Sequence, residues 1–123
     1  MAKDNGDIVE EFISLFAKKD ATLLSPYLHP DIVFEAYGDN PLKGRDKVLG
    51  LWNAVFGQMG EVKFSTIHQA TNGDIVIAEQ IHGLALPGRP LADIKNMAVY
   101  RIQDGQIIEW RDYTNPQYAQ TLM

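Results

Sequence analysis

Asp112 is the side chain of this 123-residue sequence whose surroundings best suit proton transfer. It follows Trp110 by two residues in a strand-like segment, so the two side chains share one face of a sheet. If Trp110 is inside, Asp112 is inside with it. A carboxylate on a core-facing side is costly unless it is paired or hydrogen-bonded, and its pKa is often raised towards neutrality. Asp112 is therefore the leading candidate for an acid or base.

Three more polar side chains fall on neighbouring strand-like segments. Gln80 and His82 share a face in the segment 75–86, and Asn96 points inward from the segment 91–103. Imidazole and carboxamide groups there would orient Asp112 or bind a substrate oxygen. A structural interpretation stays open beside this one, because Asp112 could pair with Arg111, Arg45 or a terminal group, and an isolated strand histidine is usually structural.

The composition excludes several classes of function. Hydrophobic residues make up 46% of the chain and charged residues 22%, which is typical of a globular domain. A net charge of -5 disfavours nucleic acid and anionic membranes as partners, and the lack of cysteine excludes thiolate chemistry. No histidine pair has the spacing of a known metal motif. There is no apolar run of ~18 residues and no signal-peptide core at residues 1–6, which predicts a cytoplasmic protein.

The elements that must position these residues fall into two halves. Helical spacing of apolar residues predicts helices over 8–16, 20–27 and 45–56 in the first half, with a strand at 32–37 and a loop after it. Turn signals at 72–73, 87–90 and 104–105 predict an antiparallel meander of four strands at 62–71, 75–86, 91–103 and 106–114. The sequence therefore predicts an α+β fold whose helices cover one concave face of a curled sheet.

Two short motifs carry a resemblance to a known family. Gly105 is followed by Trp-Arg-Asp-Tyr at 110–113, and Pro-x-x-Gly-Arg-Asp at 41–46 precedes a helix. The chain resembles the SnoaL-like branch of the nuclear transport factor 2-like superfamily, which also holds limonene-1,2-epoxide hydrolase and ketosteroid isomerase. The resemblance implies a single domain over 1–123. It also implies a cone-shaped, cystatin-like barrel with three helices on a strongly bent antiparallel sheet, a deep pocket, and a homodimer formed through the sheet.

The resemblance to the hydrolase carries over to this chain only in part. Asp112 falls on the acid/base carboxylate of the hydrolase and of the SnoaL-like cyclases. The hydrolase's Arg and second Asp look like Gln80 and His82 here, so its triad is broken. Its water-holding Tyr and Asn look like Phe34 and Ala36, neither of which can hold a water.

The resemblance to ketosteroid isomerase is also incomplete. Glu35 could serve as the base near the first strand. The first helix has no Tyr, and Met97 or Ala98 stands where the oxyanion-binding Asp would be.

Together these comparisons imply a cofactor-free acid/base enzyme acting on a small hydrophobic carbonyl compound. Asp112 would remove a proton, His82 would orient it or return a proton, and Gln80 or Asn96 would bind the enolate oxygen. The apolar walls would be Phe34, Trp52, Phe56, Leu84 and Trp110, for which ordinary core packing is the alternative.

Two other functions stay open at this point. One is an epoxide hydrolase with an altered triad, and the other is a non-catalytic ligand-binding or dimerisation module. An enzyme predicts Asp112 at the floor of a partly polar cavity. A scaffold predicts a filled cone with Asp112 in an ion pair.

Overall fold

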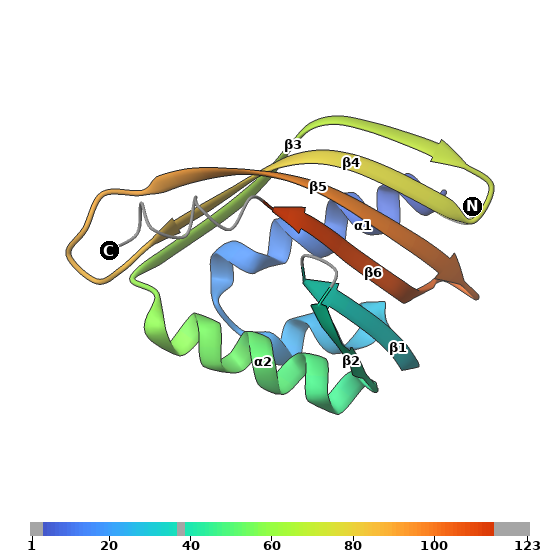
Figure 1. Cartoon of the computed structure of the whole chain (residues 1–123), viewed down its shortest axis with the longest axis horizontal. Helices are drawn as coiled ribbons and strands as arrows, with labels where there is room; N and C mark the ends of the chain where they lie inside the picture. The colour runs from blue at the N-terminus through green and yellow to red at the C-terminus, as the bar shows by residue number, and fades with distance from the viewer. Residues whose placement is uncertain (1–3, 37–38, 115–123) are drawn as a thin grey trace.

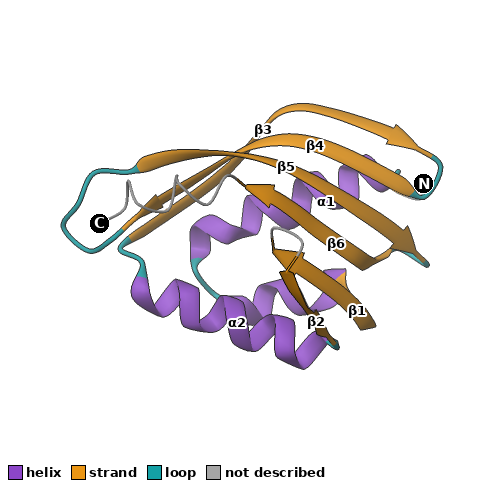
Figure 2. Cartoon of the chain, viewed as in Figure 1, coloured by secondary structure: helices purple, strands orange, loops and turns teal. Residues whose placement is uncertain are grey.

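The computed structural model describes residues 4–36 and 39–114, in which a bent sheet arches over the helices (Figure 1). The helices are α1 (Asn5–Ser14), the 3₁₀ helices η1 (Leu15–Lys18) and η2 (Ala21–Tyr27), and α2 (Arg45–Gln58). The strands are β1 (Leu28–Ala36), β2 (Asp39–Lys43), β3 (Glu61–Asn72), β4 (Ile75–Ala85), β5 (Ala92–Gln103) and β6 (Gln106–Thr114). The predicted α+β fold, with helices on the concave face, is confirmed (Figure 2).

Aspartate caps set the starts of the first helices. The Asp4 carboxylate accepts a hydrogen bond from the Asp7 backbone at 2.8 Å, which satisfies one of the free N–H groups at the start of α1. Asp20 accepts from the Thr22 backbone at 3.0 Å and starts η2 in the same way. The predicted helix at 20–27 is therefore present, as a 3₁₀ helix with Pro26 inside it.

The sheet has the order β2-β1-β6-β5-β4-β3, and the meander β3 to β6 is antiparallel as predicted. Two predictions about the remaining strands are wrong. Strand β1 pairs with β6 in parallel, so the sheet is mixed, and residues 39–43 form β2 instead of a loop. The parallel register places Phe34 beside Trp110, with ring centroids 4.2 Å apart, so both rings are buried together. Tyr37, at the end of the predicted first strand, lies outside the described residues.

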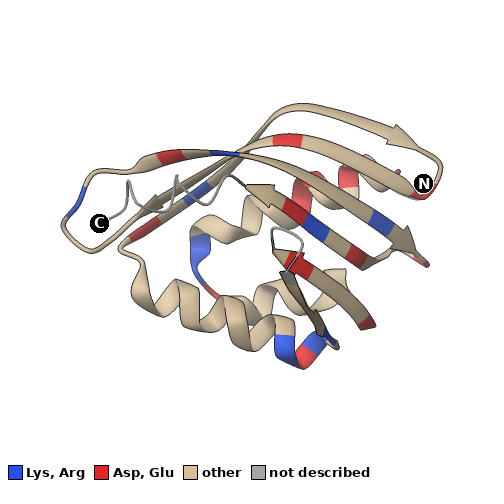
Figure 3. Cartoon of the chain, viewed as in Figure 1, with Lys and Arg blue, Asp and Glu red and all other residues tan. Residues whose placement is uncertain are grey.

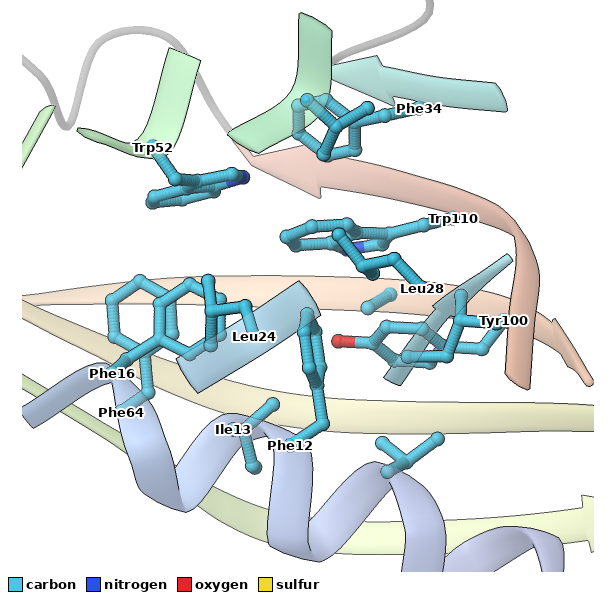
Figure 4. Packing of buried hydrophobic residues seen from close by; sticks show 14 of the residues in the cluster. Phe12, Ile13, Phe16, Leu24, Leu28, Phe34, Trp52, Phe64, Tyr100 and Trp110 are labelled. Atoms are coloured by element: carbon cyan, nitrogen blue, oxygen red, sulfur yellow. The ribbon is translucent and has the colours of Figure 1, made fainter. Parts of the chain in front are cut away.

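The core is an aromatic cluster between the helices and the sheet (Figure 4). Phe16 of η1 lies at its centre and packs edge-on against Trp52 and Trp110, with centroids 5.0 and 6.2 Å away. Trp52 from α2 stacks over Trp110 from β6 with an interplanar angle of 9°. Such pairs add to the stability that burial of the rings supplies. Across the described ranges, no helix is both long and apolar enough to cross a membrane.

Candidate acid–base site

A bulge in the last hairpin decides which residues of β6 point into the cone. The β5–β6 register shifts between Arg101 and Ile102, and beyond the shift Tyr100 pairs with Trp110 and Ala98 with Asp112. A bulge adds one residue to one strand, so the residues beyond it change the face to which they point. Ile108 is therefore only partly buried and lines an outer hollow, although unbroken alternation along the strand would place it on the same face as Trp110.

The structure brings Gln80, His82, Asn96 and Asp112 together on the inner face of the sheet. All four are buried, and among the described residues they make up the full set of buried polar or charged residues. His82 and Asp112 each keep 6% of their surface exposed, whereas Gln80 has none. All four side chains of this polar cluster are therefore shielded from water, Gln80 completely.

Asp112 is held by two donors that bind the same oxygen. Asn96 Nδ2 donates to Asp112 Oδ1 at 3.1 Å, and Trp110 Nε1 donates to it at 2.9 Å. Among residues 4–36 and 39–114, no hydrogen bond reaches Oδ2. The expectation that His82 orients Asp112 is corrected, because no hydrogen bond joins the two within the described residues: His82 Nε2 and Asp112 Oδ1 both contact Asn96 Nδ2, at 3.2 and 3.1 Å. Asn96, on the strand between them, takes that position.

The other side chains of the cluster bind one another. His82 Nε2 lies 2.9 Å from Gln80 Oε1, and Asn96 Nδ2 lies 3.3 Å from the same oxygen. His82 Nε2 also lies 3.2 Å from Asn96 Nδ2, so it either donates to Gln80 Oε1 as the Nε2–H tautomer or accepts from Asn96 as the Nδ1–H tautomer. Gln80 Nε2 in turn donates to the Tyr100 hydroxyl at 3.1 Å. The His82 ring also stacks on Phe64, with centroids 3.8 Å apart. Gln80 is therefore fully engaged inside the protein.

Burial shifts the pKa values of Asp112 and His82 in opposite directions, because in each case it favours the neutral form. Loss of water raises the pKa of Asp112 from 3.8 to about 6, while the hydrogen bonds from Asn96 and Trp110 oppose part of that rise. Burial lowers the pKa of His82 from 6.5 to about 3. At pH 7 Asp112 is therefore mostly ionised and His82 is neutral. A neutral imidazole with so low a pKa has little capacity to carry a proton near neutrality.

The arginines that could have paired with Asp112 have other partners. Arg111 points to the outer face of β6 and donates to Glu109 at 2.8 Å, where acidic and basic residues alternate along the strand (Figure 3). Arg45 reaches the backbone oxygen of Leu28 at 3.5 Å. Within the part of the chain that the structure describes, Asp112 has no ion pair.

The predicted wall residues separate into two groups. Phe34, Trp52, Phe56 and Trp110 belong to the aromatic cluster of the core, and Leu84 is partly buried against it. Glu35 is not brought to the polar cluster, because it lies on the outer face of β1 beside Ile108 and Arg111. The indole nitrogen of Trp52 is buried, and no acceptor for it occurs among the described residues.

Comparison with known proteins shows the family of the chain. The profile of the SnoaL-like domain matches residues 9–110. The chain belongs to the SnoaL-like domain family. Epoxide hydrolase EphG of Mycobacterium tuberculosis is 28% identical over 106 residues, which cover 85% of this chain and 69% of EphG.

Solved structures agree on the fold of this SnoaL-like domain. A protein of Shewanella putrefaciens assigned as a SnoaL-like polyketide cyclase matches with a TM-score of 0.84 at 12% identity, over 98% of this chain and 86% of that one. A protein of Catenulispora acidiphila with a ketosteroid isomerase-like fold, solved with trimethylamine, matches with a TM-score of 0.84 at 16% identity, over 94% and 91%. At these identities the likeness shows the fold alone.

Two residues of the SnoaL-like site were not singled out from the sequence. Tyr100 accepts from Gln80, and Thr114 donates from its hydroxyl to Asn96 Oδ1 at 2.5 Å. The signal for Thr114 was present, because it continues the alternation that places Trp110 and Asp112 on one face. In the described ranges, no three His, Asp or Glu side chains are grouped to hold a metal ion.

Proposed function

We propose that this SnoaL-like domain is a cofactor-free acid/base enzyme that acts on small hydrophobic carbonyl compounds, with Asp112 as the base. The observation that carries the proposal is the environment of the Asp112 carboxylate. It is buried, it has no ion pair among the described residues, and both of its donors bind Oδ1. Oδ2 is therefore the oxygen left to receive a proton. Burial and a pKa of about 6 suit a general base near neutral pH.

The proposed step is proton removal next to a carbonyl group. Asp112 Oδ2 takes the proton, and the electron pair of the broken C–H bond forms the C=C bond of an enolate while the carbonyl oxygen gains the negative charge. Asn96 and Trp110 continue to donate to Oδ1 of the protonated carboxyl group. The same Oδ2 then returns the proton to another carbon, or the enolate attacks a second carbonyl within the substrate and Oδ2 gives its proton to the alkoxide that forms. Isomerisation and aldol cyclisation share this first step.

The structure suggests a different donor for the enolate oxygen from those expected. Gln80 is fully buried and bound to Tyr100, His82 and Asn96, and Asn96 donates to Asp112, so neither amide is left for substrate. Trp52 supplies the indole N–H that has no acceptor among the described residues, from the ring stacked over Trp110. We assign Trp52 the role of donor to the substrate oxygen, which requires that substrate displace the side chains now covering this nitrogen. A buried donor without a partner is costly, and a bound oxygen would relieve that cost.

The pH dependence of proton exchange tests the proposal. We expect the chain to exchange the α-protons of a flat hydrophobic ketone such as 2-tetralone with D₂O, followed by NMR. The rate above background should rise with pH, because Asp112 must be ionised, and reach half its plateau near the pKa of about 6. Below that pH it should fall about tenfold per pH unit. A protein-dependent rate that does not change between pH 4 and pH 8 would exclude Asp112 as the base.

Epoxide hydrolysis is the second candidate, favoured by the similarity to EphG. Opening an epoxide needs a base for water and an acid for the departing oxygen. At the positions of the hydrolase's Arg and Asp this chain has Gln80 and His82, and the low pKa of His82 leaves it without a proton to give near neutrality. We therefore place this reaction second. Hydration of limonene-1,2-epoxide by the native chain would reverse that order.

We also propose a homodimer formed through the outer face of the sheet. Four large apolar side chains are exposed there: Ile67, Ile77, Met97 and Tyr113. Ile77 and Met97 also line a shallow hollow of about 400 Å³. A patch of this kind is typical of a protein interface. Ile77→Lys should weaken the dimer at least about tenfold in sedimentation equilibrium. Leu51→Lys makes the same change on α2 and should leave self-association unchanged, and equal behaviour of both variants would contradict this interface.

A further inference from the structure

Thr114 contacts the polar cluster through Asn96, at the oxygen end of the Asn96 amide. It is the last residue of β6, and the β5–β6 register places it directly opposite Asn96 on β5. Its hydroxyl donates to Asn96 Oδ1 at 2.5 Å, and this is the one hydrogen bond that the oxygen receives within the described residues. On the other side of the amide, Asn96 Nδ2 faces the oxygens of Asp112 and Gln80. The Asn96 amide is thus held at both ends.

We propose that Thr114 is a positioning residue for the base: its hydroxyl holds and polarises the Asn96 amide, so that Asn96 Nδ2 donates to Asp112 Oδ1. Hydrogen bonds in series strengthen one another in a site of low polarity, so a donor on Oδ1 makes the N–H groups of the same amide better donors. Asn96 is only 2% exposed, so without Thr114 its oxygen has neither water nor another donor among the described residues to bind. The side chain would then turn to find one and carry Nδ2 away from Asp112.

The consequence of this arrangement is a more acidic Asp112. A hydrogen bond to a carboxylate favours its charged form, and that from Asn96 is the larger of the two that lower the pKa of Asp112. The buried titratable side chains that could also act on it are His82 from β4 and Tyr100 from β5, and the described helix residues packed on the cluster are apolar. Thr114 and Asp112 lie on the same face of β6, but the Thr114 hydroxyl donates to Asn96, and the donors to Asp112 among the described residues are Asn96 and Trp110, so Thr114 acts on Asp112 through Asn96.

The experiment measures the pKa of Asp112 by NMR of its carboxyl carbon, which needs no substrate. We expect Thr114→Val to raise that pKa by about 0.5 and Thr114→Ser, which keeps the hydroxyl, to leave it unchanged. Thr66→Val is the matched control, because the Thr66 hydroxyl is buried on β3 without a partner among the described residues. If the methyl group that takes the place of the hydroxyl in valine does not fit, Thr114→Ala removes the same hydroxyl.

A double-mutant cycle shows whether Thr114 acts through Asn96. In an Asn96→Ala background, Thr114→Val should change the pKa of Asp112 no further, because the intermediary is gone. An unchanged pKa in Thr114→Val, or an equal rise with and without Asn96, would overturn the proposal. The effect on rate rests on the proposed function, with the half-maximal pH of exchange moving up alongside the pKa. A moved pKa without any exchange activity would therefore refute the enzyme and leave the role of Thr114 intact.

Discussion

Asp112→Asn should lower the protein-dependent exchange of ketone α-protons by about 10²–10⁴-fold, the usual contribution of a general base. Asparagine has nearly the same shape, and its oxygen can accept the hydrogen bonds that Asn96 and Trp110 now give to Oδ1. It cannot take up a proton at the position of Oδ2. The measurement is the initial exchange rate at pH 7.5, where the native carboxylate is ionised, with near-UV circular dichroism to establish that the fold is kept.

Asp93→Asn is the matched control, because it makes the same substitution at a position outside the polar cluster. Asp93 lies on β5 of the same sheet, but its side chain is exposed. Its substitution removes the same charge and should leave exchange at the native rate. If folded Asp112→Asn retains full activity, Asp112 is not the base. If native protein binds ketones without exchanging their protons, the chain is a ligand-binding member of its family.

Local signals in the sequence were sufficient to predict the meander. Asp104 and Gly105 have φ angles of 53° and 78°, which is the conformation that a tight two-residue hairpin turn requires and that Asp-Gly favours. In the β3–β4 hairpin, Gly73 is the turn residue with a positive φ, of 61°. Turn chemistry of this kind is independent of the rest of the fold, so the strand boundaries could be predicted from it.

The bulge in the last hairpin was not predictable from the same signals. Ile107 and Ile108 are both apolar, so the alternation of hydrophobic residues permits either one to face the core. Only the packing of Trp110 against β1 and the helices requires the shift that turns Ile107 inward and leaves Ile108 outside. The parallel pairing of β1 with β6 could not be predicted either, because it joins segments far apart in the chain and depends on packing rather than on local signals.

The partner of Asp112 was misassigned for a reason that strand order makes clear. His82 and Asp112 share a face, but period-two alternation says nothing about the distance between strands. In a meander, β4 and β6 are next-nearest neighbours, and a carboxamide on β5 is the group that can reach across. The strand order was already implied by the hairpins, so Asn96 could have been assigned this role from the sequence.

Asp112→Asn should also change how the stability of the fold depends on pH. Because burial raises the pKa of Asp112 to about 6, the folded chain keeps a proton between pH 3.8 and 6 that the unfolded chain has released. The free energy of unfolding therefore falls as the pH rises through this window, by about 3 kcal/mol in total. His82 acts in the opposite sense. Its pKa of about 3 keeps it neutral in the folded chain while the unfolded chain takes up a proton below pH 6.5, so stability is lost as the pH falls.

In the native chain these two contributions nearly cancel between pH 4 and pH 6, each amounting to about 1.4 kcal/mol per pH unit. Asp112→Asn removes one of them and leaves the loss from His82 uncompensated. Between pH 6.0 and pH 4.5 the variant should therefore lose about 1.5 kcal/mol more than the native chain, measured by urea unfolding at both values. Asp93→Asn should behave like the native chain. Parallel curves for Asp112→Asn and the native chain would mean that the Asp112 carboxyl ionises normally in the fold, and the chemistry assigned to it would lose its physical basis.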